Sequence, residues 1–135
     1  MLFPLAMKKL LSTLSFLLPV FLFAVENITP VQAAQLVADG KAVLIDVREP
    51  AEWLESGVAT PAMLLPKSEF DAGRLGEWKS FLAQVGDKKI ITYCRSGKRS
   101  AIVAEALAKE GHQVANAGGF KAWQEAGLPV KQVEK

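Results

Sequence analysis

The only cysteine of this chain, Cys94, lies where an apolar segment meets a helical one. The segment before it, KIITYC at residues 89–94, is β-branched and aromatic, which is typical of a buried strand. The segment after it, SAIVAEALAKE at residues 100–110, has the composition of a helix. We therefore expect Cys94 at the carboxyl end of a strand, in a loop from Cys94 to Arg99 that leads into a helix starting at Ser100.

This loop favours an ionised cysteine. A short loop before a helix turns backbone N–H groups inward, and these donors lower the pKa of a thiol from its free value of about 8.5. Gly97 can take a positive φ, and the hydroxyls of Ser96 and Ser100 can donate to sulfur. The basic residues within five positions are Arg95, Lys98 and Arg99. A cysteine that only fills space in the core is the alternative, but it needs none of these neighbours.

The other residues of the chain limit the reactions that Cys94 could carry out. Cysteine–histidine catalysis needs a base beside the sulfur. The only histidine, His112, follows the predicted helix, so we expect it at the opposite edge of the sheet. One cysteine and one histidine are too few for a dithiol cycle or a structural metal site, and we expect no metal and no cofactor. What remains is attack by a preformed thiolate on an anion whose leaving group needs no proton.

The strands and helices that are expected to position the loop alternate along the chain. Half of the 135 residues are hydrophobic, which suffices for one domain with a packed core. AVLIDV at residues 42–47 is a second apolar run of strand length, and amphipathic segments separate the runs, which is typical of a parallel sheet with helices on its faces. The other expected elements are strands at 62–65 and 113–115, helices from Pro30 to Gly40, at 49–55 and through Trp123, one or two helices at 68–84, and a turn at Gly118–Gly119.

Residues 1–24 have the layout of a secretory signal peptide. Two lysines precede an uncharged stretch, Leu10 to Ala24, which ends in a small residue before the polar VENIT. The stretch is shorter than the roughly 20 residues of a spanning helix and polar residues interrupt it. We therefore expect cleavage after Ala24, a periplasmic or secreted product, and no stable membrane insertion. Residues 25–135 contain as many basic as acidic side chains, so no basic surface for nucleic acid is expected.

Three strings resemble the single-domain rhodanese sulfurtransferases: LIDVREPAEW at 44–53, YCRSGKRSAIVAEAL at 93–107 and NAGGFKAWQEAGLPV at 116–130. The resemblance implies a doubly wound α/β rhodanese domain over residues 25–135, with a central parallel sheet of about five strands flanked by helices on both faces. It also implies a thiosulfate sulfurtransferase with Cys94 as the catalytic residue. Cys94 would accept a sulfane sulfur as a persulfide and pass it to cyanide or a thiol.

The loop charges fit the donor that the resemblance implies. Thiosulfate is a dianion, which N–H groups and basic side chains attract, and sulfite leaves as a stable anion. The expected substrate-binding residues are Arg95, Ser96, Gly97, Lys98, Arg99 and Ser100.

Asp46 and Arg48 match the DxR pattern of the family, and we expect them to pair and hold the following loop. We expect the three tryptophans to lie in the core: Trp53, Trp78 and Trp123.

Two other functions stay open. Phosphatases related to rhodanese have five residues between the cysteine and an arginine, whereas four separate Cys94 from Arg99, and Ser100 takes the arginine position. A non-catalytic sulfur carrier or binding module would also keep its cysteine. The chain departs from the family pattern at GVATPA, residues 57–62, where Val58 and Pro61 replace the usual histidine and glycine, and the local turn is therefore not predicted.

Overall fold

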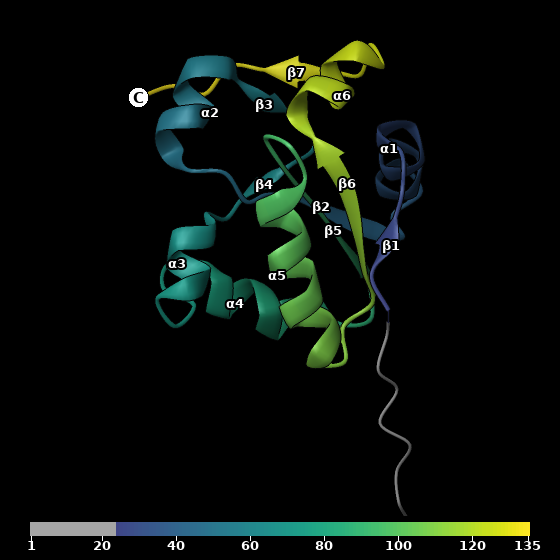
Figure 1. Cartoon of the computed structure of the whole chain (residues 1–135), viewed down its shortest axis with the longest axis vertical. Helices are drawn as coiled ribbons and strands as arrows, with labels where there is room; N and C mark the ends of the chain where they lie inside the picture. Colours follow the sequence, from purple (N-terminus) through teal and green to yellow (C-terminus); the bar gives the residue numbers. More distant parts are fainter. Residues whose placement is uncertain (1–23) are drawn as a thin grey trace, which may run out of the picture.

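The computed structural model describes residues 24–135. Five strands form one parallel sheet in the order β1-β6-β5-β2-β4 (Figure 1). The sheet places β5, which ends at Cys94, in its centre. The strands are β1 (Glu26–Asn27), β2 (Ala42–Asp46), β4 (Met63–Leu64), β5 (Lys89–Cys94) and β6 (Val114–Gly119). The predicted α/β fold with a parallel sheet of about five strands is thereby confirmed.

Helices cover both faces of the sheet (Figure 1). Neighbouring residues of a strand point to opposite faces, so Ile90 of β5 packs in the core beneath one set of helices and Ile91 in the core beneath the other. The first core holds residues of α3, α4 and α5, and the second holds residues of α1 and α6. The helices are α1 (Pro30–Ala38), α2 (Pro50–Ser56), α3 (Lys67–Asp71), α4 (Trp78–Gln84), α5 (Lys98–Lys109) and α6 (Phe120–Glu125).

The three tryptophans are buried, as predicted, and Trp78 and Trp123 lie in these two cores. Their exposed fractions are 8% for Trp53, 0% for Trp78 and 2% for Trp123. Trp78 Nε1 donates to the Pro66 carbonyl and Trp123 Nε1 to the Pro129 carbonyl, both at 2.9 Å. Both indole N–H groups thus keep a partner after burial, and the rings stabilise the helices that surround the site.

Helix α5 begins at Lys98, two residues before the predicted start at Ser100. The prediction was wrong because the basic first turn of the helix has no apolar periodicity and reads as loop. Gly97, at φ 96°, adopts the left-handed conformation and turns the chain directly from the strand into the helix. Only three residues, Arg95 to Gly97, therefore connect β5 to α5.

The segment GVATPA forms part of a second, two-stranded sheet that the sequence did not predict. Here β3 (Val58–Ala59) pairs antiparallel with β7 (Val130–Lys131). Val58 is fully buried, whereas Pro61 is exposed in the turn that the Ala62 N–H closes on the Ala59 carbonyl. The departure from the family pattern is thus accommodated by an apolar contact at Val58 and a surface position at Pro61.

The predicted signal peptide, residues 1–24, lies outside the described residues except for Ala24. Within the described part of the chain, none of the helices has the length and apolar character needed to cross a membrane.

The helical region predicted at 68–84 forms two helices, α3 and α4, because the glycine-containing segment between them interrupts it.

Candidate active site around Cys94

Cys94 lies at the carboxyl edge of the sheet, with α5 directing its N-terminal end toward it. Its side chain is fully buried, with 0% of the residue exposed. Burial alone is compatible with a cysteine that only fills space in the core. The partners of the sulfur therefore decide between an inert thiol and a reactive one.

The hydrogen bonds at the sulfur favour the thiolate. The Gly97 N–H donates to Sγ of Cys94 at 3.0 Å, and Oγ of Ser100 lies 3.4 Å from Sγ. Burial raises the pKa of Cys94, but hydrogen bonds from the Ser100 hydroxyl and from the N–H groups of Ser100, Gly97 and Ser96 outweigh it and hold the pKa below its ordinary value. Donors fixed by the backbone need no rearrangement when charge forms on sulfur.

Asn116 on β6 holds this loop from the side, and it was not among the site residues predicted from the sequence. Its Nδ2 donates to the Gly97 carbonyl at 2.9 Å, while its Oδ1 accepts from the Ser100 hydroxyl at 2.8 Å and from the Gly118 N–H at 3.1 Å. The residue is buried, so these partners take the place of water. Its only sequence signal was its position just before the pair Gly118–Gly119.

That glycine pair packs against the cysteine loop. Gly119 pairs with Cys94 in the sheet, so the turn predicted at Gly118–Gly119 is instead the end of β6. A Cβ at Gly119 would collide with the Arg95 carbonyl oxygen. The two backbones can approach this closely only because Gly119 has no side chain, and the approach fixes the position of the loop.

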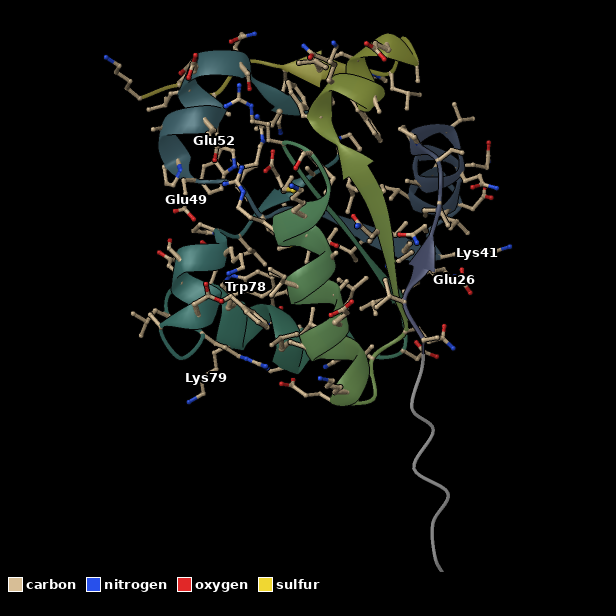
Figure 2. All side chains as sticks on the ribbon, viewed as in Figure 1. Glu26, Lys41, Glu49, Glu52, Trp78 and Lys79 are labelled. Carbon is tan, nitrogen blue, oxygen red and sulfur yellow. The ribbon has the colours of Figure 1, made fainter. Side chains whose placement is uncertain are left out.

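The basic residues of the loop differ in their partners. Arg99 donates two hydrogen bonds to the Glu52 carboxylate, at 2.8 and 2.7 Å. Figure 2 shows Glu52 on α2, beside the start of α5. Arg95 and Lys98 are exposed and form no salt bridge with any residue in the described range 24–135. Lys98 and Arg99 lie in the first turn of α5, where cations oppose the helix dipole, and an anion bound there would offset that cost.

Asp46 and Arg48 form the ion pair predicted at the end of β2. Arg48 Nη2 lies 2.8 Å from Asp46 Oδ2, with 3% and 0% of the two side chains exposed. Asp46 also accepts from the Tyr93 hydroxyl at 2.5 Å, and burial and the Asp46 charge raise the pKa of Tyr93, so the phenol stays a donor. Arg48 donates to the Ser56 hydroxyl and the Gly57 carbonyl, both at 2.8 Å. The pair thus ties the end of α2 to the sheet.

A pocket of about 420 Å³ adjoins the loop at Arg95. Its lining combines both signs of charge with one aromatic side chain, and comprises Arg48, Glu52, Glu55, Ser56, Arg95, Phe120, Lys121 and Gln124. Among residues 24–135, no group of three or more His, Cys, Asp or Glu side chains could hold a metal ion. The pocket therefore offers charged groups and hydrogen-bond donors to a ligand.

His112 lies at the opposite edge of the sheet, as predicted. It precedes β6, and its N–H donates to the Leu107 carbonyl near the end of α5. Helix α5 has 12 residues and is about 18 Å long. Because this length separates His112 from the cysteine loop, the imidazole is out of reach of the sulfur as a base.

Comparison with known proteins agrees with this fold. The family model "Rhodanese-like domain" matches residues 29–126. The "Thiosulfate sulfurtransferase GlpE" of Actinobacillus succinogenes is 33% identical over 110 residues, which cover 80% of this chain and 92% of that protein. An uncharacterized protein of Synechocystis sp. is 33% identical over 106 residues that cover 77% of this chain, and the chain spans only 55% of that protein's length.

Solved structures place the chain in the same group. A rhodanese-related protein from Thermoplasma volcanium superposes with a TM-score of 0.65 at 28% identity, over 80% of this chain and 99% of that one. The family model covers most of the described residues, and the sulfurtransferase relative matches over nearly its whole length. The chain therefore belongs to the rhodanese-like sulfurtransferase family.

Proposed function

We propose that this chain is a thiosulfate sulfurtransferase, an enzyme that moves a sulfane sulfur from thiosulfate to cyanide or a thiol through a persulfide on Cys94. The observation that carries the proposal is the Gly97 N–H aimed at the buried sulfur at 3.0 Å, with the other loop donors beside it. A buried thiol without such donors would keep its proton, whereas one with them ionises more easily. Relatives named thiosulfate sulfurtransferase and sulfurtransferase support this assignment.

In the first step, the Cys94 thiolate attacks the outer sulfur of thiosulfate. A bond forms between Sγ and that sulfur, the S–S bond of thiosulfate breaks, and its electron pair leaves with sulfite. One negative charge on the cysteine and two on thiosulfate become one on the persulfide and two on sulfite. No proton moves, so the step needs no base, which fits the distant position of His112.

In the second step, the acceptor attacks the outer sulfur of the persulfide. With cyanide, a carbon–sulfur bond forms, the persulfide S–S bond breaks, and its electron pair returns to Sγ as the thiolate while thiocyanate leaves. The same donors that stabilise the initial thiolate, the N–H groups of Ser96 and Gly97 and the Ser100 hydroxyl, would stabilise the regenerated one. The loop thus serves both half-reactions.

The exposed loop cations would bring the donor to this site. Arg95 and Lys98 present their charges beside the pocket and at the start of α5. A dianion approaching the loop meets these two charges, the helix dipole and the inward N–H groups together. We assign Arg95 and Lys98 to attraction of the donor, and Ser96, Gly97 and Ser100 to stabilisation of the charged sulfur.

The phosphatase alternative finds less support in the loop. The position that would hold the phosphate-binding arginine is Ser100, which is buried and bonded to Asn116. The nearest arginine, Arg99, directs both terminal nitrogens to Glu52. Ser100 has no guanidinium, and Arg99 would have to leave Glu52 before it could make the bidentate contact that such enzymes need.

We also propose that the protein is exported to the periplasm or secreted after removal of residues 1–24. Cleavage after Ala24 would leave the sheet whole, because β1 begins at Glu26. Edman sequencing of the protein from a fractionated bacterial culture should read Val25 first in the exported fraction. A start at Met1 or Met7 would contradict export by cleavage.

The proposed activity is tested by thiocyanate formation from thiosulfate and cyanide. The wild type should turn over with initial rates that fit a double-displacement pattern, and Cys94→Ser should be inactive. The same preparations are then given a phosphotyrosine analogue, which should not be hydrolysed. Phosphate release without thiocyanate would assign the loop to a phosphatase, and persulfide formation without turnover would assign it to a carrier.

A further inference from the structure

The ion pair of Glu52 and Arg99 connects α2 to the first turn of α5. Glu52 Oε1 accepts from Arg99 Nη2 at 2.7 Å, and Oε2 accepts both from Arg99 Nη1 at 2.8 Å and from the Glu49 N–H at 2.9 Å. The Arg99 hydrogen bonds, chiefly, lower the pKa of Glu52 to about 2. The carboxylate is therefore ionised throughout the neutral range, and it neutralises a cation that lies five residues after the cysteine.

This pair is open to competition from dissolved anions. About a third of the Arg99 side chain and a quarter of the Glu52 side chain are exposed, at 33% and 25%, whereas the Asp46–Arg48 pair has 0% and 3%. Ion pairs in contact with water are held weakly, because each partner regains hydration when they separate. Glu52 also lines the pocket that adjoins the loop at Arg95.

Arg99 is within electrostatic reach of the sulfur. Its pKa is raised chiefly by the hydrogen bonds to Glu52, and the charge of Cys94 raises it further. A change in the charge around Arg99 therefore acts on whatever approaches Cys94. With Glu52 in place, the pair contributes no net charge to the mouth of the site.

We propose that Glu52 sets how strongly the Cys94 site prefers anionic to neutral reagents, because an incoming anion must compete with the Glu52 carboxylate for the Arg99 guanidinium. Glu52 is thus a specificity-determining residue. Where the anion is thiosulfate, the inference rests on the proposed function. Glu52 would then weaken donor binding and, by returning to Arg99, help the sulfite dianion to leave.

Glu52→Gln is a conservative test of this competition. The glutamine removes the charge but keeps an oxygen for the Glu49 N–H, as Gln32 does for the Thr29 N–H at the start of α1, at 2.9 Å. Glu55→Gln is the matched control: Glu55 lies on the same helix and lines the same pocket, and it forms no salt bridge within residues 24–135. Thermal melting of each variant checks that it is folded.

The readout is alkylation of Cys94, the only cysteine, by two reagents of similar size, anionic iodoacetate and neutral iodoacetamide. The ratio of their second-order rate constants cancels the thiolate fraction and the accessibility of the sulfur. Glu52→Gln should raise the iodoacetate to iodoacetamide ratio by about three- to tenfold, and Glu55→Gln by less than about 1.5-fold. When Arg99→Gln is already present, adding Glu52→Gln should raise the ratio by much less than it does in the wild type.

A ratio that is unchanged or lower in Glu52→Gln, or that rises as much in Glu55→Gln, overturns the proposal. So does a Glu52→Gln effect that stays as large when Arg99 is replaced. The alkylation ratio needs no enzymatic activity, so it separates this inference from the proposed function. If thiosulfate is the donor, its KM and the inhibition constant of sulfite should both fall in Glu52→Gln by factors similar to the rise in the ratio.

Discussion

The Ser100 hydroxyl lies 2.8 Å from Oδ1 of Asn116. Because Nδ2 of Asn116 donates to the Gly97 carbonyl, the Asn116 atom facing Ser100 is an acceptor, and the single hydroxyl proton points to it when Cys94 is a thiol. When Cys94 ionises, the same proton can turn to Sγ, which lies 3.4 Å from the hydroxyl oxygen. Ser100 thus offers the sulfur a donor only in its charged state.

Replacement of Ser100 by alanine should raise the pKa of Cys94, because the thiolate loses one of its donors. The pH midpoint of iodoacetamide alkylation should therefore move upward, and the rate lost near neutral pH should recover in more alkaline solution. Ser96→Ala is the control, since Ser96 contributes its backbone N–H and keeps it in the variant. An unchanged midpoint in Ser100→Ala would show that the hydroxyl does not serve the sulfur.

Asn116→Ala should destabilise the fold. The variant leaves the Gly97 carbonyl, the Gly118 N–H and the Ser100 hydroxyl without their partner, at a cost of about 1–3 kcal/mol in the free energy of unfolding. Urea denaturation measures this loss. Asn27→Ala is the control, because Asn27 pairs with Asn116 between β1 and β6 but is exposed. Equal losses in the two variants would contradict a special role for Asn116.

The central strands were predictable because both are contiguous apolar runs of strand length. AVLID became β2 and KIITYC became β5, and the loop after β5 followed from its cysteine, glycine and basic residues. Asp46 and Arg48 were also predictable as a pair, since they are two positions apart at the end of a strand. The central strands, the loop and the ion pair each depend on residues close together in the sequence, so the local sequence was sufficient to predict them.

The partners of the loop were not predictable, because they come from distant parts of the chain. Glu52 is 47 residues from Arg99 in sequence, and their contact requires α2 to lie beside the start of α5. Asn116 reaches Ser100 only because β6 lies next to β5 in the sheet. The sequence shows which loop residues are basic or carry a hydroxyl and where they lie. Which of these side chains is bonded to another residue depends on the tertiary arrangement.

Arg48→Met should be strongly destabilising. The variant leaves the Asp46 carboxylate buried without its countercharge, which typically costs about 3–5 kcal/mol. The control is Lys67→Met, which breaks the ion pair with Asp71, an i,i+4 pair with more than half of the Asp71 side chain exposed, and should cost less than about 1 kcal/mol. Urea denaturation of both variants gives the comparison. A loss in Arg48→Met as small as that in Lys67→Met would contradict a stabilising role for the buried pair.

Lys98→Ala should raise the KM for thiosulfate and change kcat little, since an exposed cation attracts the dianion without touching the bond that breaks. Added salt should raise the wild-type KM and narrow the difference between the two proteins. Lys109→Ala, at the far end of the same helix, is the control and should keep the wild-type KM. A fall in kcat at constant KM would place Lys98 in the chemical step instead.

The central claim, that the Cys94 thiolate takes the outer sulfur of thiosulfate, is tested most directly by intact mass spectrometry. The protein is incubated with thiosulfate without an acceptor, desalted under non-reducing conditions and weighed. The wild type should gain the mass of one sulfur atom, and cyanide should remove it, while Cys94→Ser should gain nothing. A wild-type mass unchanged by thiosulfate, or a gain that Cys94→Ser shares, would contradict the account.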